Sequence, residues 1–160
     1  MKISEQDRAD IKRCLAGIID TPQAQSMKTF VQHGDITTYT HVINVVRMSC
    51  RVDGWLHAHS DRRSLIRGAF LHDFYLYDWH DPTSNEGLHG FKHPVRALRK
   101  AEALFALNPK ERNIIVSHMW PLTITRFPRC REAAIVCLSD KLCALYETVL
   151  KDKRLFDADF

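Results

Sequence analysis

The sequence predicts an all-α protein, a single-domain helical bundle that spans residues 1–160. Apolar residues recur three and four positions apart along most of the chain, the spacing that gathers them on one face of a helix. No segment alternates apolar and polar residues with a period of two, and 6 Gly and 6 Pro are too few for a sandwich of many tight turns. A length of 160 residues is enough for one sizeable core and too short for two ordinary domains.

Four helices are expected in the first half of the chain, each behind a residue that can cap it or that ends the preceding segment. The first follows Ser4, which together with Asp7 resembles a capping box. The second is short and ends by about Val31. The expected starting points are Ser4, Gln23, Thr37 or Thr38, and Asp61. The fourth helix ends at the dipeptide His72-Asp73.

Three further helices are expected in the second half, separated from the first four by a long irregular stretch. Residues 77–92 read YDWHDPTSNEGLHGFK, which is rich in turn formers, and loops of that length are usually functional or disordered. A second loop covers residues 119–131. The three helices are expected after His93-Pro94, from Asn108-Pro109 to His118, and over about 132–150.

Charge and cysteine content restrict the class of protein. The formal net charge of +4 and the pI near 8.9 suit a small anionic partner and are too mild to indicate nucleic-acid binding. The 5 cysteines form no CxxC pair, so we expect free thiols and a reducing, cytoplasmic environment. The N-terminus is polar and the longest apolar run covers only 133–138, so neither a signal peptide nor a membrane helix is expected.

Asp140 is the most informative residue of the chain. It lies in AAIVCLSDKLCALY, a segment so apolar that most of the surface of the helix must be buried. An ionised carboxylate there costs on the order of several kcal/mol unless a positive charge compensates it. A metal ion would provide that charge. A salt bridge, a helix cap or a helix rotated toward solvent would explain the residue equally well.

For four histidines and a second carboxylate, a metal ion must likewise be weighed against ordinary explanations. His41 shares a helical stripe with Val45 and Met48, and the other residues lie at helix ends. Each alone has an ordinary explanation, as a hydrogen-bonded core histidine, a helix-boundary residue or a cation at a helix C-terminus. The whole set is harder to explain in that way, and it comprises His41, His72, Asp73, His93, His118 and Asp140.

These residues form the pattern H…HD…H…H…D, which resembles the HD-domain superfamily of metal-dependent phosphohydrolases. The resemblance covers about residues 37–150 and implies a helical bundle whose side chains converge on a metal centre. The additional His93 and His118 resemble subfamilies that hold two ions. The resemblance implies one ion held by His41, His72, Asp73 and Asp140, with Asp73 bridging to a second ion held by His93 and His118.

The chemistry of these side chains suits a dinuclear centre. Imidazoles and carboxylates bind Fe, Mn, Co, Ni or Zn, and the absence of a cysteine cluster argues against a structural zinc. We expect two divalent transition-metal ions, with Fe or Mn favoured. Two metals about 3.5–4 Å apart can share a hydroxide and clamp a phosphoryl group. The expected function is hydrolysis of a phosphate ester or nucleotide by a metal-bound hydroxide, with His72 and Asp73 as the catalytic residues.

The two irregular stretches each adjoin a proposed ligand in the sequence, so we expect them at the mouth of the metal centre. Their cations are the candidate contacts for a small anionic phosphorylated substrate, although each could instead be a solvated surface group. The candidates are His80, His89, Lys92, Arg126 and Arg129. Lys141 is expected at the surface, because it lies one helical step away from Asp140.

Two departures from the family pattern and two rival functions remain. His72-Asp73 is not followed by a Gly-Lys pair and the chain has no GYP tripeptide, which argues against cyclic dinucleotides as substrates. The chain is also too short for the substrate elements of nucleotidase and nucleotide-triphosphohydrolase relatives. An HD-type di-iron oxygenase carries the same six-ligand pattern, and a non-catalytic nucleotide-binding module would keep the site as well. The ligands alone do not distinguish these alternatives.

Overall fold

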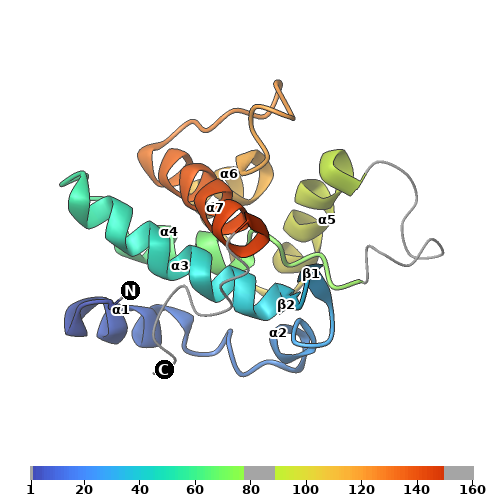
Figure 1. Cartoon of the computed structure of the whole chain (residues 1–160), viewed down its shortest axis with the longest axis horizontal. Helices are drawn as coiled ribbons and strands as arrows, with labels where there is room; N and C mark the ends of the chain where they lie inside the picture. Colours follow the sequence, from blue (N-terminus) through green and yellow to red (C-terminus); the bar gives the residue numbers. More distant parts are fainter. Residues whose placement is uncertain (1, 78–88, 150–160) are drawn as a thin grey trace.

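A computed structural model describes residues 2–77 and 89–149 of the chain. In these residues it contains seven helices and one antiparallel hairpin, so the predicted all-α class is confirmed (Figure 1). The helices are α1 (Glu5–Leu15), α2 (Pro22–Ser26), α3 (Thr38–Trp55), α4 (Arg62–Leu71), α5 (His89–Leu104), α6 (Pro109–Ser117) and α7 (Arg131–Val149). The hairpin consists of β1 (Val31–His33) and β2 (Ile36–Thr37).

Side-chain caps begin four of the helices where the sequence predicts them. The Ser4 side chain accepts a hydrogen bond from the Asp7 N–H, and Asn108 forms a reciprocal capping box with Glu111. The other two predicted caps, Thr37 and Asp61, begin α3 and α4. Each cap satisfies a backbone N–H that would otherwise lack a partner in the first turn.

The hairpin is not anticipated by the sequence pattern. It begins at Val31, and α2 ends at Ser26, earlier than expected. Gly34 makes the turn possible, because its φ of +55° lies in the left-handed region that glycine tolerates. The strands have three and two residues, too few to display a period of two.

Helix α5 begins earlier than the sequence predicts. It starts at His89 rather than after His93, so Pro94 lies inside the helix. Proline is tolerated there because it falls in the second turn, where only the carbonyl of Gly90 loses its helical hydrogen bond. The early start places His93 within a helix instead of at a boundary.

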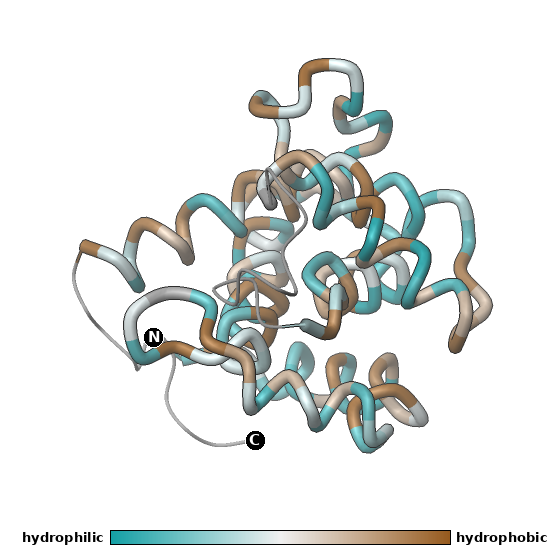
Figure 2. Tube along the Cα trace, turned by 90° about the vertical axis from the view of Figure 1, so that its right-hand side faces the viewer, coloured by the Kyte–Doolittle hydropathy of each residue, from teal (hydrophilic) through white to brown (hydrophobic). Residues whose placement is uncertain are grey.

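Helix α3 is central to the packing. It contacts α4 and α7, while α6 contacts α4, α5 and α7, and α1 packs against α4. Figure 1 shows α5 on the right of the bundle and α1 below it. Apolar and polar residues alternate along the helical turns, as expected when one face of each helix is buried (Figure 2). The core includes Val42, Val45, Ile66, Phe70, Ile114 and Val136, all fully buried.

Two features hold the helices close together. A Cβ atom at Gly68 would overlap the side chain of Ile114, so glycine permits the close approach of α4 and α6. The same two helices are joined by Arg67, whose Nε lies 2.6 Å from Oε1 of the fully buried Glu111.

All 5 cysteines are unpaired. None of the described helices is both long and apolar enough to cross a membrane.

Glu132 links α7 to α4 and α6. Its Oε1 accepts hydrogen bonds from the Asp61 N–H at 2.9 Å and from Lys110 Nζ at 2.8 Å. Burial alone would raise the pKa of Glu132, but these two donors outweigh burial and lower the pKa from 4.5 to about 2. The ionised form of Glu132 is therefore more stable in the folded chain than in the unfolded chain.

We expect the Glu132→Gln variant to lose stability in a pH-dependent manner. Because the folded pKa is depressed, the contribution of Glu132 is complete above pH 4.5 and disappears as the pH falls through about 2. Denaturant unfolding of both proteins should give a difference in unfolding free energy that is largest near neutral pH and shrinks toward pH 2. An equal difference at both ends of this range would contradict the assignment.

Candidate metal centre

The six predicted ligands come together from three helices, α3, α5 and α7, and from the residues that follow α4 and α6. His41 lies on α3, His93 on α5 and Asp140 on α7. His72 and His118 are the C-cap residues of α4 and α6. All six side chains are buried, and Asp140, at 9% exposure, is the most accessible of them. Apart from the neighbours His72 and Asp73, these residues are distant in sequence, so the packing of the bundle brings them together.

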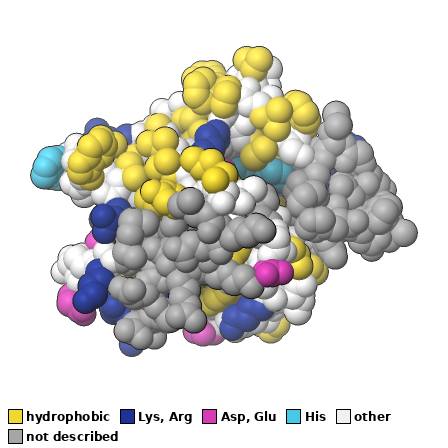
Figure 3. Space-filling model, in the orientation of Figure 1, with side chains coloured by type: hydrophobic (Ala, Val, Ile, Leu, Met, Phe, Trp, Pro, Cys, Tyr) yellow, Lys and Arg dark blue, Asp and Glu magenta, His cyan; other side chains and the backbone are white. Residues whose placement is uncertain are grey.

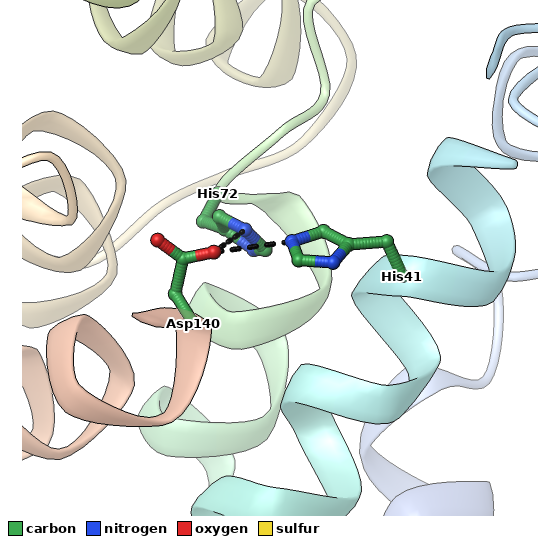
Figure 4. Close-up of side chains that lie close together, drawn as sticks. All are labelled: His41, His72 and Asp140. Carbon is green, nitrogen blue, oxygen red and sulfur yellow. Dashed lines mark hydrogen bonds and ion pairs between the residues drawn. The ribbon is translucent and has the colours of Figure 1, made fainter. Parts of the chain in front are cut away.

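His41, His72 and Asp140 form the first group (Figure 4). Oδ1 of Asp140 lies 3.1 Å from Nε2 of His41 and 3.6 Å from Nε2 of His72. One ligand atom from each residue lies within 4.8 Å of the other two. These three atoms point toward one another and could bind one metal ion.

Asp73 lies between this group and a second pair of histidines. Its Oδ2 lies 3.5 Å from Nε2 of His72 and 3.9 Å from Nε2 of His41. Its Oδ1 faces the other way, 3.2 Å from Nε2 of His93 and 3.4 Å from Nε2 of His118. One carboxylate thus presents a different oxygen to each histidine pair, an arrangement that suits a bridging ligand.

Two buried atoms at the centre support the fit of a metal ion. Nε2 of His72 and Oδ1 of Asp73 are inaccessible to solvent, and neither makes a hydrogen bond within the described part of the chain. A buried polar atom without a partner costs free energy. Coordination of a cation would satisfy both atoms, and imidazole nitrogen with carboxylate oxygen is a donor set that transition metals prefer.

The outer nitrogens of two histidines fix the direction of their rings. Nδ1 of His72 lies 2.7 Å from the Ala69 carbonyl, and Nδ1 of His118 lies 2.8 Å from the Ile115 carbonyl. A carbonyl can only accept, so Nδ1 carries the proton in both rings. In the neutral imidazole, the lone pair of Nε2 is then directed at the centre, where Nε2 of His118 lies 2.8 Å from Nε2 of His93.

Sequence reasoning missed two residues that support the ligands. Glu147 is 4% exposed, and its Oε2 lies 2.7 Å from Nδ1 of His41. Asn44 donates to the other oxygen of Glu147 at 2.9 Å. Glu147 lies seven residues after Asp140 on the same helical face, so the argument applied to Asp140 could also have identified it.

Gln32 is the second of these supporting residues. Its Nε2 donates to Oδ2 of Asp73 at 2.7 Å, and its Oε1 accepts hydrogen bonds from Tyr75 and Thr38. Gln32 lies in the unexpected strand β1, where no sequence pattern marks it. The hairpin therefore holds the central carboxylate in place.

The electrostatics keep both central carboxylates ionised. Burial alone would raise the pKa of Asp73 and that of Asp140, but the neighbouring histidines hold both values well below the ordinary range. Burial lowers the pKa of His118, which favours its neutral form. Burial also lowers the pKa of His41 and of His72, but the carboxylates of Asp140 and Glu147 raise the pKa of His41, and those of Asp73 and Asp140 raise the pKa of His72. A metal ion would displace the protons of these two rings, because ionised carboxylate and neutral imidazole are the protonation states that bind metal.

The centre opens into a cavity of about 620 Å³. Its other walls are largely apolar, with Met119, Pro121, Leu122 and Ala144 among the lining residues. Figure 3 shows histidine surface in a recess beside a group of exposed hydrophobic side chains. A cavity of this size is within the range that binds small molecules.

The predicted substrate contacts are distributed differently. Lys141 is exposed, as expected, and it also lines this cavity, since its long side chain donates to the His118 carbonyl at 2.9 Å. Lys92 is exposed on α5 and is not among the lining residues. Arg126 and Arg129 line a separate cavity. His80 and the side chain of His89 lie outside the described residues.

No family model, no curated protein and no solved structure matches the chain. The resemblance to the HD-domain superfamily therefore stays an expectation from the sequence motif.

We expect the protein to bind a transition metal, at up to about two ions per chain. Asp73→Ala should lower the content of both ions, because each oxygen of Asp73 faces one histidine pair. Asp140→Ala should lower mainly the ion near His41 and His72. Elemental analysis after reconstitution with Fe or Mn measures both effects, with the exposed Asp20→Ala as the matched control. Full metal content in both site variants would refute the ligand assignment.

We expect Glu147→Gln to weaken metal binding without unfolding the protein. The amide keeps the shape of the side chain but loses the charge that orients His41 through Nδ1. Loss of such an outer-sphere carboxylate typically lowers metal affinity about 10- to 100-fold. A competition titration with a chelator measures the affinity, and circular dichroism checks the fold. An unchanged affinity would show that Glu147 has only a packing role.

Proposed function

We propose that the protein is a metal-dependent phosphohydrolase that acts on a phosphate ester or nucleotide through a dinuclear centre. The observation that carries this proposal is the position of Asp73, with one oxygen toward His41 and His72 and the other toward His93 and His118. A mononuclear site would need no carboxylate between two histidine pairs. The free thiols of the chain agree with a reducing, cytoplasmic environment.

The ligand set would hold two ions. His41, His72 and Asp140 would bind the first ion, His93 and His118 the second, and Asp73 both. Bound divalent ions would activate a water molecule as the nucleophile and offset the negative charge of a phosphoryl group. Six protein ligands are too few to saturate two octahedral ions, which leaves positions for water and substrate.

The other residues of the centre position these ligands and the substrate. Gln32 holds Oδ2 of Asp73, and Glu147 holds His41. Lys141 is the one cationic side chain among the described residues that line the cavity. We assign it the role of contacting a phosphate oxygen, in place of the loop arginines. Its ammonium group can exchange a backbone carbonyl for the anion.

The apolar walls of the cavity favour one second candidate, an HD-type di-iron oxygenase. Met119, Pro121, Leu122 and Ala144 offer no charged group to a phosphate. An oxygenase substrate with few charges would suit these walls, and it would use the same six ligands. The two candidates differ in whether the reaction consumes oxygen.

Turnover of phosphate esters by Fe- or Mn-reconstituted protein tests the proposal. We expect hydrolysis of a nucleoside monophosphate or p-nitrophenyl phosphate under anaerobic conditions. Lys141→Ala should lower kcat/KM by about 10- to 100-fold, the value of a lost hydrogen bond to a charged group. Metal content should remain unchanged in this variant, and Lys12→Ala on α1 serves as the control.

Two outcomes would overturn the proposal. In the first, no phosphate ester is hydrolysed while the reduced iron form consumes oxygen in the presence of a small polyol or phosphonate, which supports the oxygenase. In the second, metal-loaded protein binds nucleotides without turnover of any kind, which supports a non-catalytic module. Binding of the metal can be followed separately by its stabilisation of the fold, since a ligand that binds only the native state raises Tm.

A further inference from the structure

A second cavity, of about 500 Å³, lies along α5, α6 and the loop between α6 and α7. That loop is drawn in orange at the top of Figure 1. Within residues 2–77 and 89–149, the second cavity shares no lining residue with the cavity at the metal centre. Among the described residues, those that matter for binding are Lys110, Arg112, Arg126, Phe127 and Arg129.

The second cavity carries an excess of positive charge. Four of its lining side chains are cationic, and none of the described lining residues is a carboxylate. Lys110 and Arg112 are neutralised from outside the lining, since their nitrogens each lie 2.8 Å from an oxygen of Glu132 and of Glu102, respectively. The other two cations are the arginines of the loop.

Arg126 and Arg129 have no carboxylate partner within the described residues. Nη1 of Arg126 donates to the Phe91 carbonyl at 3.1 Å, which leaves the rest of its guanidinium available. The guanidinium carbon of Arg129 lies 5.4 Å from the centre of the Phe127 ring. Planar guanidinium groups with free donors bind phosphate in bidentate fashion, and both of these arginines line the same cavity.

The remaining walls suit an organic group rather than a bare anion. Phe127 is 50% exposed, although a large apolar side chain gains free energy from burial. Leu98 and Val116 extend the apolar surface beside it. A ring stacked on Phe127 would cover this surface while its phosphate reaches the arginines.

We propose that the second cavity binds a nucleoside monophosphate, or a phosphorylated metabolite with a similar planar ring, separately from the metal centre. The phosphate contacts Arg126 and Arg129, and the ring packs on Phe127. A volume of about 500 Å³ accommodates a ligand of this size but not a folded partner. The inference goes beyond the proposed hydrolase activity and does not depend on it.

The two cavities are neighbours along the chain. Met119 and Leu122 of the loop line the metal cavity, and residues 125–130 contribute to the second. Arg126 also binds the Phe91 carbonyl, two residues before the proposed ligand His93. The test must therefore distinguish binding in the second cavity from binding at the metal centre.

Calorimetric titration of chelator-treated protein with adenosine monophosphate tests the proposal. Removal of metal excludes binding through coordinated ions. We expect Arg126→Ala and Arg129→Ala each to weaken binding by about tenfold, the low end of the value of a hydrogen bond to a charged group. Arg51→Ala is the matched control, because Arg51 also donates to a backbone carbonyl, at 3.0 Å, and lines neither cavity. Its affinity should equal that of the wild type.

Two further variants locate the ligand. Asp73→Ala should retain full affinity for adenosine monophosphate. Phe127→Leu should weaken the binding of adenosine monophosphate more than the binding of inorganic phosphate. Circular dichroism confirms that each variant is folded, and the exposed Arg129 makes its variant the least disruptive. Equal affinity in the wild type, Arg126→Ala and Arg129→Ala would overturn the proposal. Loss of binding in Asp73→Ala with retention in both arginine variants would also overturn it, by placing the ligand at the metal centre.

Discussion

The ionised carboxylate of Asp73 is the constraint on which the centre of the molecule depends. A carboxylate that is only 2% exposed is costly unless its surroundings compensate the charge. Four histidines and Gln32 surround it, and they come from α3, α4, α5, α6 and the hairpin. The arrangement of these elements around one charge explains why a small bundle buries so many titratable groups together, and it is the same feature that makes the centre suitable for metal ions.

Two helices end in the same arrangement, which fixes the orientation of a histidine ring. His72 and His118 are C-cap residues, and the Nδ1 atom of each binds the carbonyl three residues earlier. The last carbonyls of a helix lack helical partners, so this contact satisfies one of them and fixes the ring at the same time. The C-terminal end of a helix thus determines which nitrogen faces the centre. His41 reaches the same result by a different route, through the buried carboxylate of Glu147.

Sequence reasoning identified the helices and the convergence of charge, and it failed where the outcome depends on contacts between distant segments. Capping residues such as Thr37 and Asp61 act within a few positions, so their effect can be read locally. Asp140 was recognisable because its apolar helix makes a carboxylate conspicuous. The hairpin that carries Gln32 is too short for a periodic signal. Arg126 was expected beside the metal centre because it follows His118 in sequence, but the loop carries it to another cavity.

The distribution of charge explains why the two cavities differ in their walls. The metal cavity has three buried carboxylates nearby, those of Asp73, Asp140 and Glu147. Two divalent ions would outweigh these three charges by one and would attract an anion, so apolar walls and the single Lys141 are compatible with a phosphorylated substrate. The described lining of the second cavity contains no such group of ligands, and there the attraction for an anion depends on arginines. Metal ions would thus supply the positive charge at the metal cavity, whereas arginine side chains supply it at the second cavity.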